Sequence, residues 1–169
     1  MNASAATRDD LFEILDEVKD PEVPVLSVVE LGIVRDARVE NDVAIVTITP
    51  TYSGCPAMQV IEEDIRAALV EHGFAAVNVE TVFAPAWTTD WLSVEAKQKL
   101  EAYGIAPPGP TARQSLVSLT RAPSAAERMR CPYCHSLETE GRSEFGSTAC
   151  KAIAYCAKCQ QPFEIFKAL

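Results

Sequence analysis

The chain has 169 residues, 48% of them hydrophobic, and its 24 acidic and 15 basic side chains give a net charge of −9. This composition supports one ordinary domain or two small ones and excludes a disordered chain. The negative charge argues against a general nucleic-acid binder, because phosphate binding requires a basic surface.

The sequence also limits the cellular compartment. It has no apolar run long enough to span a membrane, so no transmembrane segment is expected. Its first ten residues, MNASAATRDD, lack the basic and apolar regions of a secretory signal, which favours a cytoplasmic protein. In that reducing compartment, the 6 cysteines are expected to be metal ligands or reactive thiols rather than disulfides.

Charge and proline content divide the chain into three parts. Residues 1–104 carry 19 acidic and 7 basic side chains, whereas residues 105–169 carry 5 and 8. The prolines at 107, 108, 110 and 123 forbid a continuous helix and favour an extended tether. The sequence therefore predicts a first domain over residues 1–104, a Pro-rich linker over 105–125 and a second domain over 126–169.

The first expected element is a helix capped by Thr7 or Asp9. It should end at Asp20-Pro21, because a residue before proline avoids the helical region. Its apolar positions recur at helical spacing: Leu11, Ile14, Leu15 and Val18. Two runs typical of strands, residues 33–39 and 43–49, flank Asn41-Asp42 and predict a hairpin.

A second helix is expected to begin at Pro56 and to end at His72-Gly73. Its apolar face consists of Met58, Ile61, Ile65, Ala68 and Leu69. A third strand over residues 76–82 and a last helix over 93–103 follow. Between them, Trp87 and Trp91 are expected to share a helix face and pack in the core. The order predicts an α+β fold, a small αββαβ(α) domain with helices on one sheet face.

Cys55 is the one cysteine of the first domain, and it lies where a strand gives way to a helix. Gly54 permits a tight turn before it, and Pro56 suits the first helical position. The helix dipole at this point favours a thiolate, the form that binds iron or attacks an electrophile. The alternative is a buried, inert cysteine, which is common.

The second domain holds two CxxC pairs, Cys131–Cys134 and Cys156–Cys159, separated by 21 residues. Four thiolates complete a tetrahedral zinc site, and a hairpin between the pairs would absorb the intervening residues. This spacing predicts a zinc ribbon whose metal supplies much of the folding free energy. Few other residues offer a core: Phe145, Ile153, Tyr155, Phe163, Ile165 and Phe166.

Cys150 lies outside both pairs and is expected to pack as a hydrophobic side chain, with a role as alternative ligand left open. His135 follows Cys134 directly, but four cysteines already satisfy a zinc site, so a position beside the site or in solvent is expected. His72 is expected to interact with the helix end.

Three segments resemble a known family. DPEVPVLSVVELGIV (residues 20–34) is similar to the signature of the metal-sulfur cluster biosynthetic family, and TYSGCPA (51–57) to its cysteine motif. Together with the run from CPYC to CAKCQQPFEIFK, the chain resembles the branch of this family that has a C-terminal zinc ribbon and is encoded with the phenylacetyl-CoA epoxidase system.

The resemblance implies a function in iron-sulfur cluster assembly or transfer. It implies that Cys55 binds iron or a cluster transiently, with Asp20 and Glu22 in the loop beside it, and that the four ribbon cysteines bind structural zinc. The implied partners are the epoxidase subunits, especially the iron-sulfur reductase. A homodimer could supply further cysteines, since a cluster normally takes four. Asp20 and Glu22 could equally be turn residues.

Two other functions stay open. The first is a noncatalytic adaptor of the epoxidase complex, in which the ribbon presents Tyr133, Phe163 and Phe166 to a partner. The second is an enzyme with Cys55 as nucleophile and His72 as base, which is disfavoured because a helix length separates the two. A maturation factor is expected rather than a true catalyst.

Overall fold

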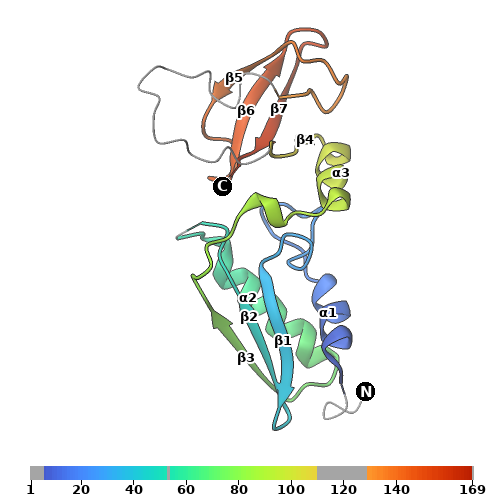
Figure 1. Ribbon diagram of the computed structural model, residues 1–169, viewed down its shortest axis with the longest axis vertical. Coiled ribbons are helices and arrows are strands. Elements are labelled where there is room, and N and C mark those ends of the chain that lie inside the picture. Colours follow the sequence, from blue (N-terminus) through green and yellow to red (C-terminus); the bar gives the residue numbers. More distant parts are fainter. Residues whose placement is uncertain (1–5, 53, 110–128, 169) are drawn as a thin grey trace. The chain divides into compact units, whose positions relative to one another are not determined.

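The structure is a computed structural model that describes residues 6–52, 54–109 and 129–168. Contacts divide the chain into two compact units, Met1–Leu92 and Ser93–Leu169. Each unit has its own sheet (Figure 1). The expected α+β class is confirmed, because the first unit combines helices with a three-stranded sheet and the second builds strands around the cysteine pairs.

The first helix, α1 (Arg8–Asp16), begins at the expected cap. The backbone N–H of Asp10 donates to Thr7 Oγ1, and Thr7 N–H donates to the Asp10 carboxylate, which forms a capping box. The helix ends four residues before the expected stop, because Lys19 already forms a β-bridge with Ser27. The apolar stripe is buried as predicted: Leu11, Ile14, Leu15 and Val18.

The sheet of the first unit has the order β1-β2-β3, formed by β1 (Val34–Glu40), β2 (Val43–Ile48) and β3 (Ala76–Thr81). The β1–β2 hairpin turns at Asn41 and Asp42, whose φ angles of 50° and 63° fit the two-residue turn that matches strand twist. Strands β2 and β3 are parallel and therefore need a crossover, which is α2 (Ala57–Glu71).

The core of the first unit lies between the sheet and its helices. One side of β2 is fully buried, while the residues between are only half-buried. Helix α2 crosses the sheet on this side (Figure 1). Its predicted end is confirmed, since His72 is the C-cap and Gly73 follows with a φ of 95°. The buried side chains facing each other are Ala44, Val46 and Ile48 of β2 and Ala57, Ile61, Ile65 and Leu69 of α2.

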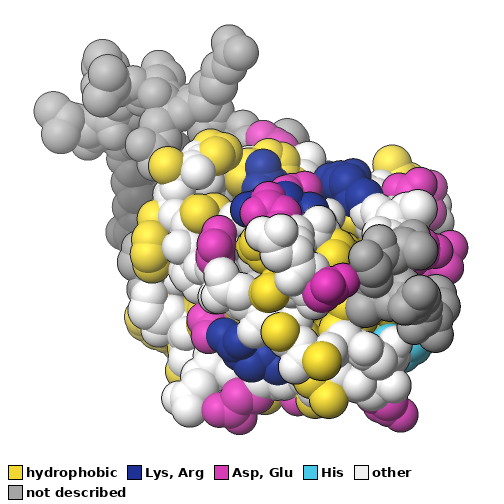
Figure 2. Space-filling model, turned by 90° about the horizontal axis from the view of Figure 1, so that it is seen from below, with side chains coloured by type: hydrophobic (Ala, Val, Ile, Leu, Met, Phe, Trp, Pro, Cys, Tyr) yellow, Lys and Arg dark blue, Asp and Glu magenta, His cyan; other side chains and the backbone are white. Residues whose placement is uncertain are grey.

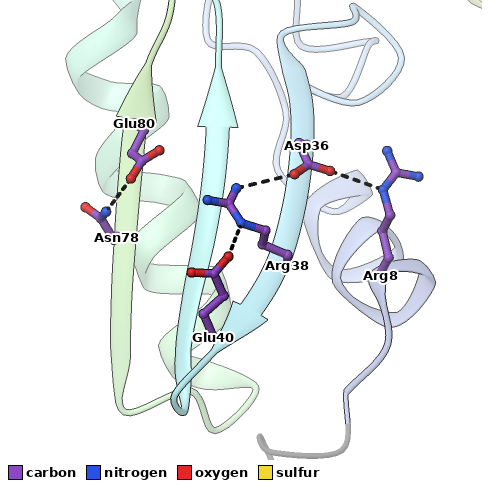
Figure 3. Close-up of polar contacts among 6 residues, drawn as sticks. All are labelled: Arg8, Asp36, Arg38, Glu40, Asn78 and Glu80. Carbon is purple, nitrogen blue, oxygen red and sulfur yellow. Dashed lines mark hydrogen bonds and ion pairs between the residues drawn. The ribbon is translucent and has the colours of Figure 1, made fainter.

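Polar side chains line another part of the first unit (Figure 3). Arg38 of β1 donates to Glu40 over 2.7 Å and to Asp36 over 3.3 Å, and Arg8 of α1 donates to Asp36 over 3.3 Å. Each of these side chains is at least 40% exposed, so the ion pairs contribute little to stability. They mark solvated surface rather than a site.

The two tryptophans do not share a helix face as expected. Trp91 ends a short 3-10 helix, η2 (Thr89–Trp91), and Trp87 lies outside it in an extended segment. Trp87 is nevertheless buried, and its indole N–H donates to the backbone oxygen of Leu31 over 2.8 Å. The ring of Trp91 stacks on the Arg35 guanidinium at 3.7 Å from its centroid. Trp87 thus packs in the core, which is the role expected from the sequence.

Trp87→Phe is expected to lower the free energy of unfolding of the first unit by about 1–3 kcal/mol, because the buried Leu31 carbonyl loses its donor. Chemical denaturation followed by circular dichroism measures this loss. Trp91→Phe is the matched control and is expected to cost less than about 1 kcal/mol, since phenylalanine keeps a ring for Arg35. Equal effects of the two variants would contradict the assignment.

The second unit begins with α3 (Val94–Tyr103), the helix expected over residues 93–103, and adds β4 (Ile105–Ala106), β5 (Thr139–Ser143), β6 (Lys151–Cys156) and β7 (Gln161–Phe166). The sheet order is β4-β7-β6-β5. Strands β5 and β6 form the hairpin expected between the cysteine pairs. Of the predicted core, Phe163, Ile165 and Phe166 are buried, whereas Phe145 is 71% exposed.

The division between the units differs from the expected boundary after residue 104. Strand β4 pairs with β7 in parallel, Ile105 beside Glu164 and Ala106 beside Ile165. In agreement with this pairing, α3 and β4 belong to the second unit, and the division of the chain falls between Leu92 and Ser93. The predicted linker of residues 105–125 therefore starts within a strand, and its residues 110–125 lie outside the described part of the chain.

Candidate functional site

Cys55 lies in the loop that leads from β2 into α2. Its N–H donates to the backbone oxygen of Tyr52 over 3.2 Å, and Met58 N–H donates to the Cys55 oxygen over 3.3 Å. Gly54 has a φ of 84°, which a side chain would strain. The thiol is half-buried and therefore partly accessible to solvent. The loop thus presents one sulfur at the beginning of a helix, as the sequence predicts.

The surroundings of Cys55 do not favour the expected thiolate. Burial raises the pKa of the Cys55 thiol above its usual value, and the charges of Glu22 and Asp20 raise it further. Hydrogen bonds from the Ala57 N–H and the Tyr52 side chain act in the opposite direction but do not compensate. The effect expected from the helix start is thus outweighed, first by burial of the thiol and then by two carboxylates from a different part of the chain.

Asp20 and Glu22 belong to the loop between α1 and β1. Asp20 is only 6% exposed, and its Oδ1 accepts hydrogen bonds from Glu22 N–H over 2.7 Å and from Val23 N–H over 2.8 Å. Asp20 therefore stabilises the turn, one of the two roles left open from the sequence. Glu22 is half-buried. Because both charges act on Cys55, the structure brings these three residues into one neighbourhood.

Glu22→Gln is expected to speed alkylation of Cys55 by iodoacetamide near neutral pH. Removing the negative charge lowers the raised pKa of the thiol, so a larger fraction is thiolate at a given pH. The difference should vanish once the pH exceeds the pKa in both proteins. Mass spectrometry of the Cys55 peptide measures the rate. Glu80→Gln, on β3, is the control and should leave it unchanged; equal acceleration by both variants would contradict the local effect.

The four ribbon cysteines converge on one point. The Sγ atoms of Cys131, Cys134, Cys156 and Cys159 all lie within 4.8 Å of one another, and the pairs Cys131–Cys159 and Cys134–Cys156 are 3.6 Å apart. Four sulfurs at about 2.3 Å from a tetrahedral zinc ion would be about 3.8 Å apart. The residues therefore fit a four-thiolate metal site, and the group is partly buried.

The backbone shapes both cysteine pairs in the same way. Each pair is followed by a residue with positive φ, His135 at 58° and Gln160 at 59°. Each of these residues donates its N–H to the oxygen of the first cysteine of its pair, over 2.9 Å in both cases. The Cys159 N–H also donates toward Cys156 and lowers its pKa to about 7. Two equivalent turns thus aim four sulfurs at one position.

The remaining cysteine and histidines lie apart from the ribbon site. Cys150 is buried at 4% exposure, as expected, with its Sγ 3.1 Å from Thr148 Oγ1. His135 is 60% exposed on its side chain, and its Nδ1 lies 3.2 Å from Glu101. His72 Nδ1 lies 2.9 Å from the Ala68 oxygen at the far end of α2. A 15-residue helix of about 22 Å therefore separates His72 from Cys55.

The adaptor interpretation loses two of its three proposed contact residues. Phe163 and Phe166 are 3% and 1% exposed, because they belong to the core of the ribbon sheet. Tyr133 is 55% exposed and remains accessible. The alternation of β7 could have indicated the burial of Phe163, which shares a strand face with Ile165, but not that of Phe166, which is adjacent to Ile165.

The described residues contain no helix that could cross a lipid bilayer. On the face shown in Figure 2, Asp and Glu side chains lie among the Lys and Arg side chains, with hydrophobic side chains between them. The expectation that nucleic acid is not a partner stays a prediction.

Comparison with known proteins identifies both parts of the chain. Residues 8–82 match the family of iron-sulfur cluster assembly proteins, and residues 117–167 match the PaaD zinc beta ribbon domain. A crystal structure of the domain of unknown function DUF59 from Bacillus anthracis is 32% identical, with a TM-score of 0.51, over 55% of this chain and 90% of its own. Fold and cysteines thus define an iron-sulfur assembly domain joined to a metal-binding ribbon.

Two relatives extend the comparison. An Escherichia coli protein, named as one of the subunits of a "Putative 1,2-phenylacetyl-CoA epoxidase", is 40% identical over 95% of this chain and 92% of its own length. A "Fe-S protein maturation auxiliary factor" of Porphyromonas gingivalis is 36% identical over 59% of this chain and 95% of its own. The chain belongs to the PaaD family, which the sequence resemblance indicated.

Proposed function

We propose that this protein is an iron-sulfur cluster assembly or transfer factor that matures the phenylacetyl-CoA epoxidase system in the cytoplasm, with the iron-sulfur reductase of that system as its main client. The family match supports the general function, and the name of the Escherichia coli relative supports the epoxidase system as its setting. Within the chain, the observation that carries the proposal is the half-buried Cys55 thiol next to Asp20 and Glu22.

The charges around Cys55 favour a cation over a free thiolate. The carboxylates that raise the pKa of the thiol would attract iron, and iron binding would release the thiol proton. Sulfur and carboxylate oxygen are both iron ligands. Asp20 accepts two backbone hydrogen bonds that hold its turn, so part of its role is structural.

A single cysteine cannot complete the ligand set of a cluster, which normally takes four thiolates. Cys55 therefore needs a second copy of the chain or the client to supply the rest. Incomplete ligation leaves the cargo exchangeable, which a transfer factor requires. The four ribbon cysteines have the opposite design: they form a complete set, and we propose that they hold zinc permanently as a structural ion.

Anaerobic reconstitution with iron and sulfide tests this function. Wild type should bind iron beyond the ribbon metal, whereas Cys55→Ser should retain only the ribbon metal. Cys150→Ser is the control, because it also removes a thiol, but one that is buried in the second unit. Equal iron content of wild type and Cys55→Ser would leave the adaptor function, in which Tyr133 contacts a partner and Cys55 has no role.

A further inference from the structure

Helix α3 and strand β4 are fastened to the ribbon at several places. Strand β4 extends the ribbon sheet through its parallel pairing with β7. Ala106 is 1% exposed and belongs to the same hydrophobic cluster as Cys131 and Cys156, two of the four cysteines of the metal site. Ala106, which precedes Cys131 by 25 positions in the sequence, is thus part of the hydrophobic cluster that contains two of the metal-site cysteines.

A second set of contacts reaches the first cysteine pair itself. Gly104 is the C-cap of α3 with a φ of 92°, and a β-carbon placed on it would lie 3.0 Å from Tyr133 Oη. Glu101 of α3 lies 3.2 Å from Nδ1 of His135. Tyr133 lies between the two cysteines of the pair and His135 directly after it. The positions of the Tyr133 and His135 side chains therefore depend on the turn that directs Cys131 and Cys134 toward the metal site.

We propose that metal binding at the four cysteines holds α3 and β4 on the ribbon, and that loss of the metal releases them. A metal bound by all four sulfurs would hold the two turns together; without it, the turns lose that common partner and keep the hydrogen bonds within each turn. Tyr133 and His135 then lose their positions, and so do Gly104 and Glu101 opposite them. Residues 93–106 would join the connection between the two units.

The metal thereby sets how the two units are linked. In the structure, the unit that carries Cys55 ends at Leu92 and the ribbon unit starts at Ser93, so α3 and β4 belong to the ribbon unit. On loss of the metal, residues 93–106 would instead become a flexible part of the connection. Removal of the ribbon metal by a chelator would change the tethering of the Cys55 unit without any change at Cys55.

Thermodynamic linkage makes the coupling reciprocal: if the metal favours docking of α3, docking must favour the metal. A substitution that weakens docking should therefore lower the affinity for the metal, even though it lies outside the cysteine pairs. Gly104→Ala is such a substitution, because alanine is strained at positive φ and its β-carbon would contact the Tyr133 ring. Gly109→Ala is the matched control, since its β-carbon would meet nothing within 4 Å.

The test uses the full-length zinc-loaded protein, with the partition of Zn²⁺ between protein and a colorimetric chelator measured at equilibrium. Gly104→Ala should bind zinc at least about 5-fold more weakly than wild type, and Gly109→Ala with the wild-type affinity. Hydrogen exchange of wild type supplies a second measurement that needs no variant. Zinc removal should abolish protection over residues 94–106, while α1 and β2 keep theirs.

Equal zinc affinity of wild type, Gly104→Ala and Gly109→Ala would overturn the proposal. So would persistent protection of residues 94–106 after β6 and β7 have lost theirs, because α3 and β4 would then be held by something other than the metal-organised ribbon. If Gly104→Ala fails to accumulate as a folded protein, the wild-type exchange experiment decides alone.

Discussion

Replacing Cys131 with serine is expected to abolish tight metal binding and to unfold the ribbon. Cys131 is fully buried and lies in the hydrophobic cluster with Ala154 and Phe163, so its metal bond and the core are lost together. Four-cysteine zinc sites contribute an apparent binding free energy of about 10–16 kcal/mol, which a small sheet cannot replace. Metal content should fall from one ion per chain to none, and the ribbon peptides should become protease-sensitive.

Cys150→Ser is the matched control for this prediction. Cys150 is also buried in the second unit and also loses its sulfur in the variant, but it lies outside the four-cysteine group. This variant should keep one metal ion per chain, with a modest loss of stability from packing a hydroxyl. A metal ion retained by Cys131→Ser, or lost by both variants, would show that the four sulfurs are not the ligand set.

Cys55→Ser is expected to reduce activation of the apo-reductase to the level seen without the protein. Serine keeps the size of the side chain but replaces the soft sulfur by a hydroxyl that does not ionise near neutral pH and binds iron weakly. Activation is measured as recovery of reductase activity after anaerobic incubation with iron, sulfide and the variant. The ribbon metal should stay at one ion per chain.

Two further variants help to interpret the effect of Cys55→Ser on client activation. Cys150→Ser should activate the client as wild type does, since its thiol is buried in the ribbon unit. If Cys55→Ser activates the client normally, Cys55 has no part in transfer and the protein acts as an adaptor. Tyr133→Ala would then be the informative variant, because Tyr133 is the accessible aromatic residue of the ribbon turn.

Most elements of the first unit could be predicted because their signals are local. The Thr7 cap and its reciprocal partner Asp10 lie three residues apart, and the Asn41-Asp42 turn is flanked directly by its strands. The CxxC pairs are equally local, since each turn is closed by a hydrogen bond within five residues. Such features depend on backbone geometry that a few residues determine.

The features that escaped prediction depend on residues far apart in the sequence. Strand β4 has two residues and pairs with a strand about sixty positions later, so no periodicity could reveal it. The raised pKa of Cys55 comes first from burial of the thiol and then from carboxylates more than thirty positions earlier, and both oppose the effect expected from the helix. Likewise, the indole N–H of Trp87 donates to the backbone oxygen of Leu31, a residue 56 positions earlier, whereas the sequence predicted packing through a helix face shared with Trp91.

The chain thus contains two sulfur sites of different design. The ribbon site has four converging cysteines and a shared core, which suits an ion that stays. The Cys55 site has one half-buried thiol and neighbouring carboxylates, which suits cargo that leaves. The proposed function depends on this difference in the completeness of ligation.

The most direct test of that difference is transfer of radiolabelled iron from loaded protein to apo-reductase in the presence of a chelator that captures free iron. Wild type should deliver labelled iron to the reductase despite the chelator, because the iron passes directly from Cys55 to the client without release into solution. Cys55→Ser should deliver no labelled iron. Equal delivery by both proteins, or delivery by wild type that the chelator abolishes, would contradict transfer through Cys55.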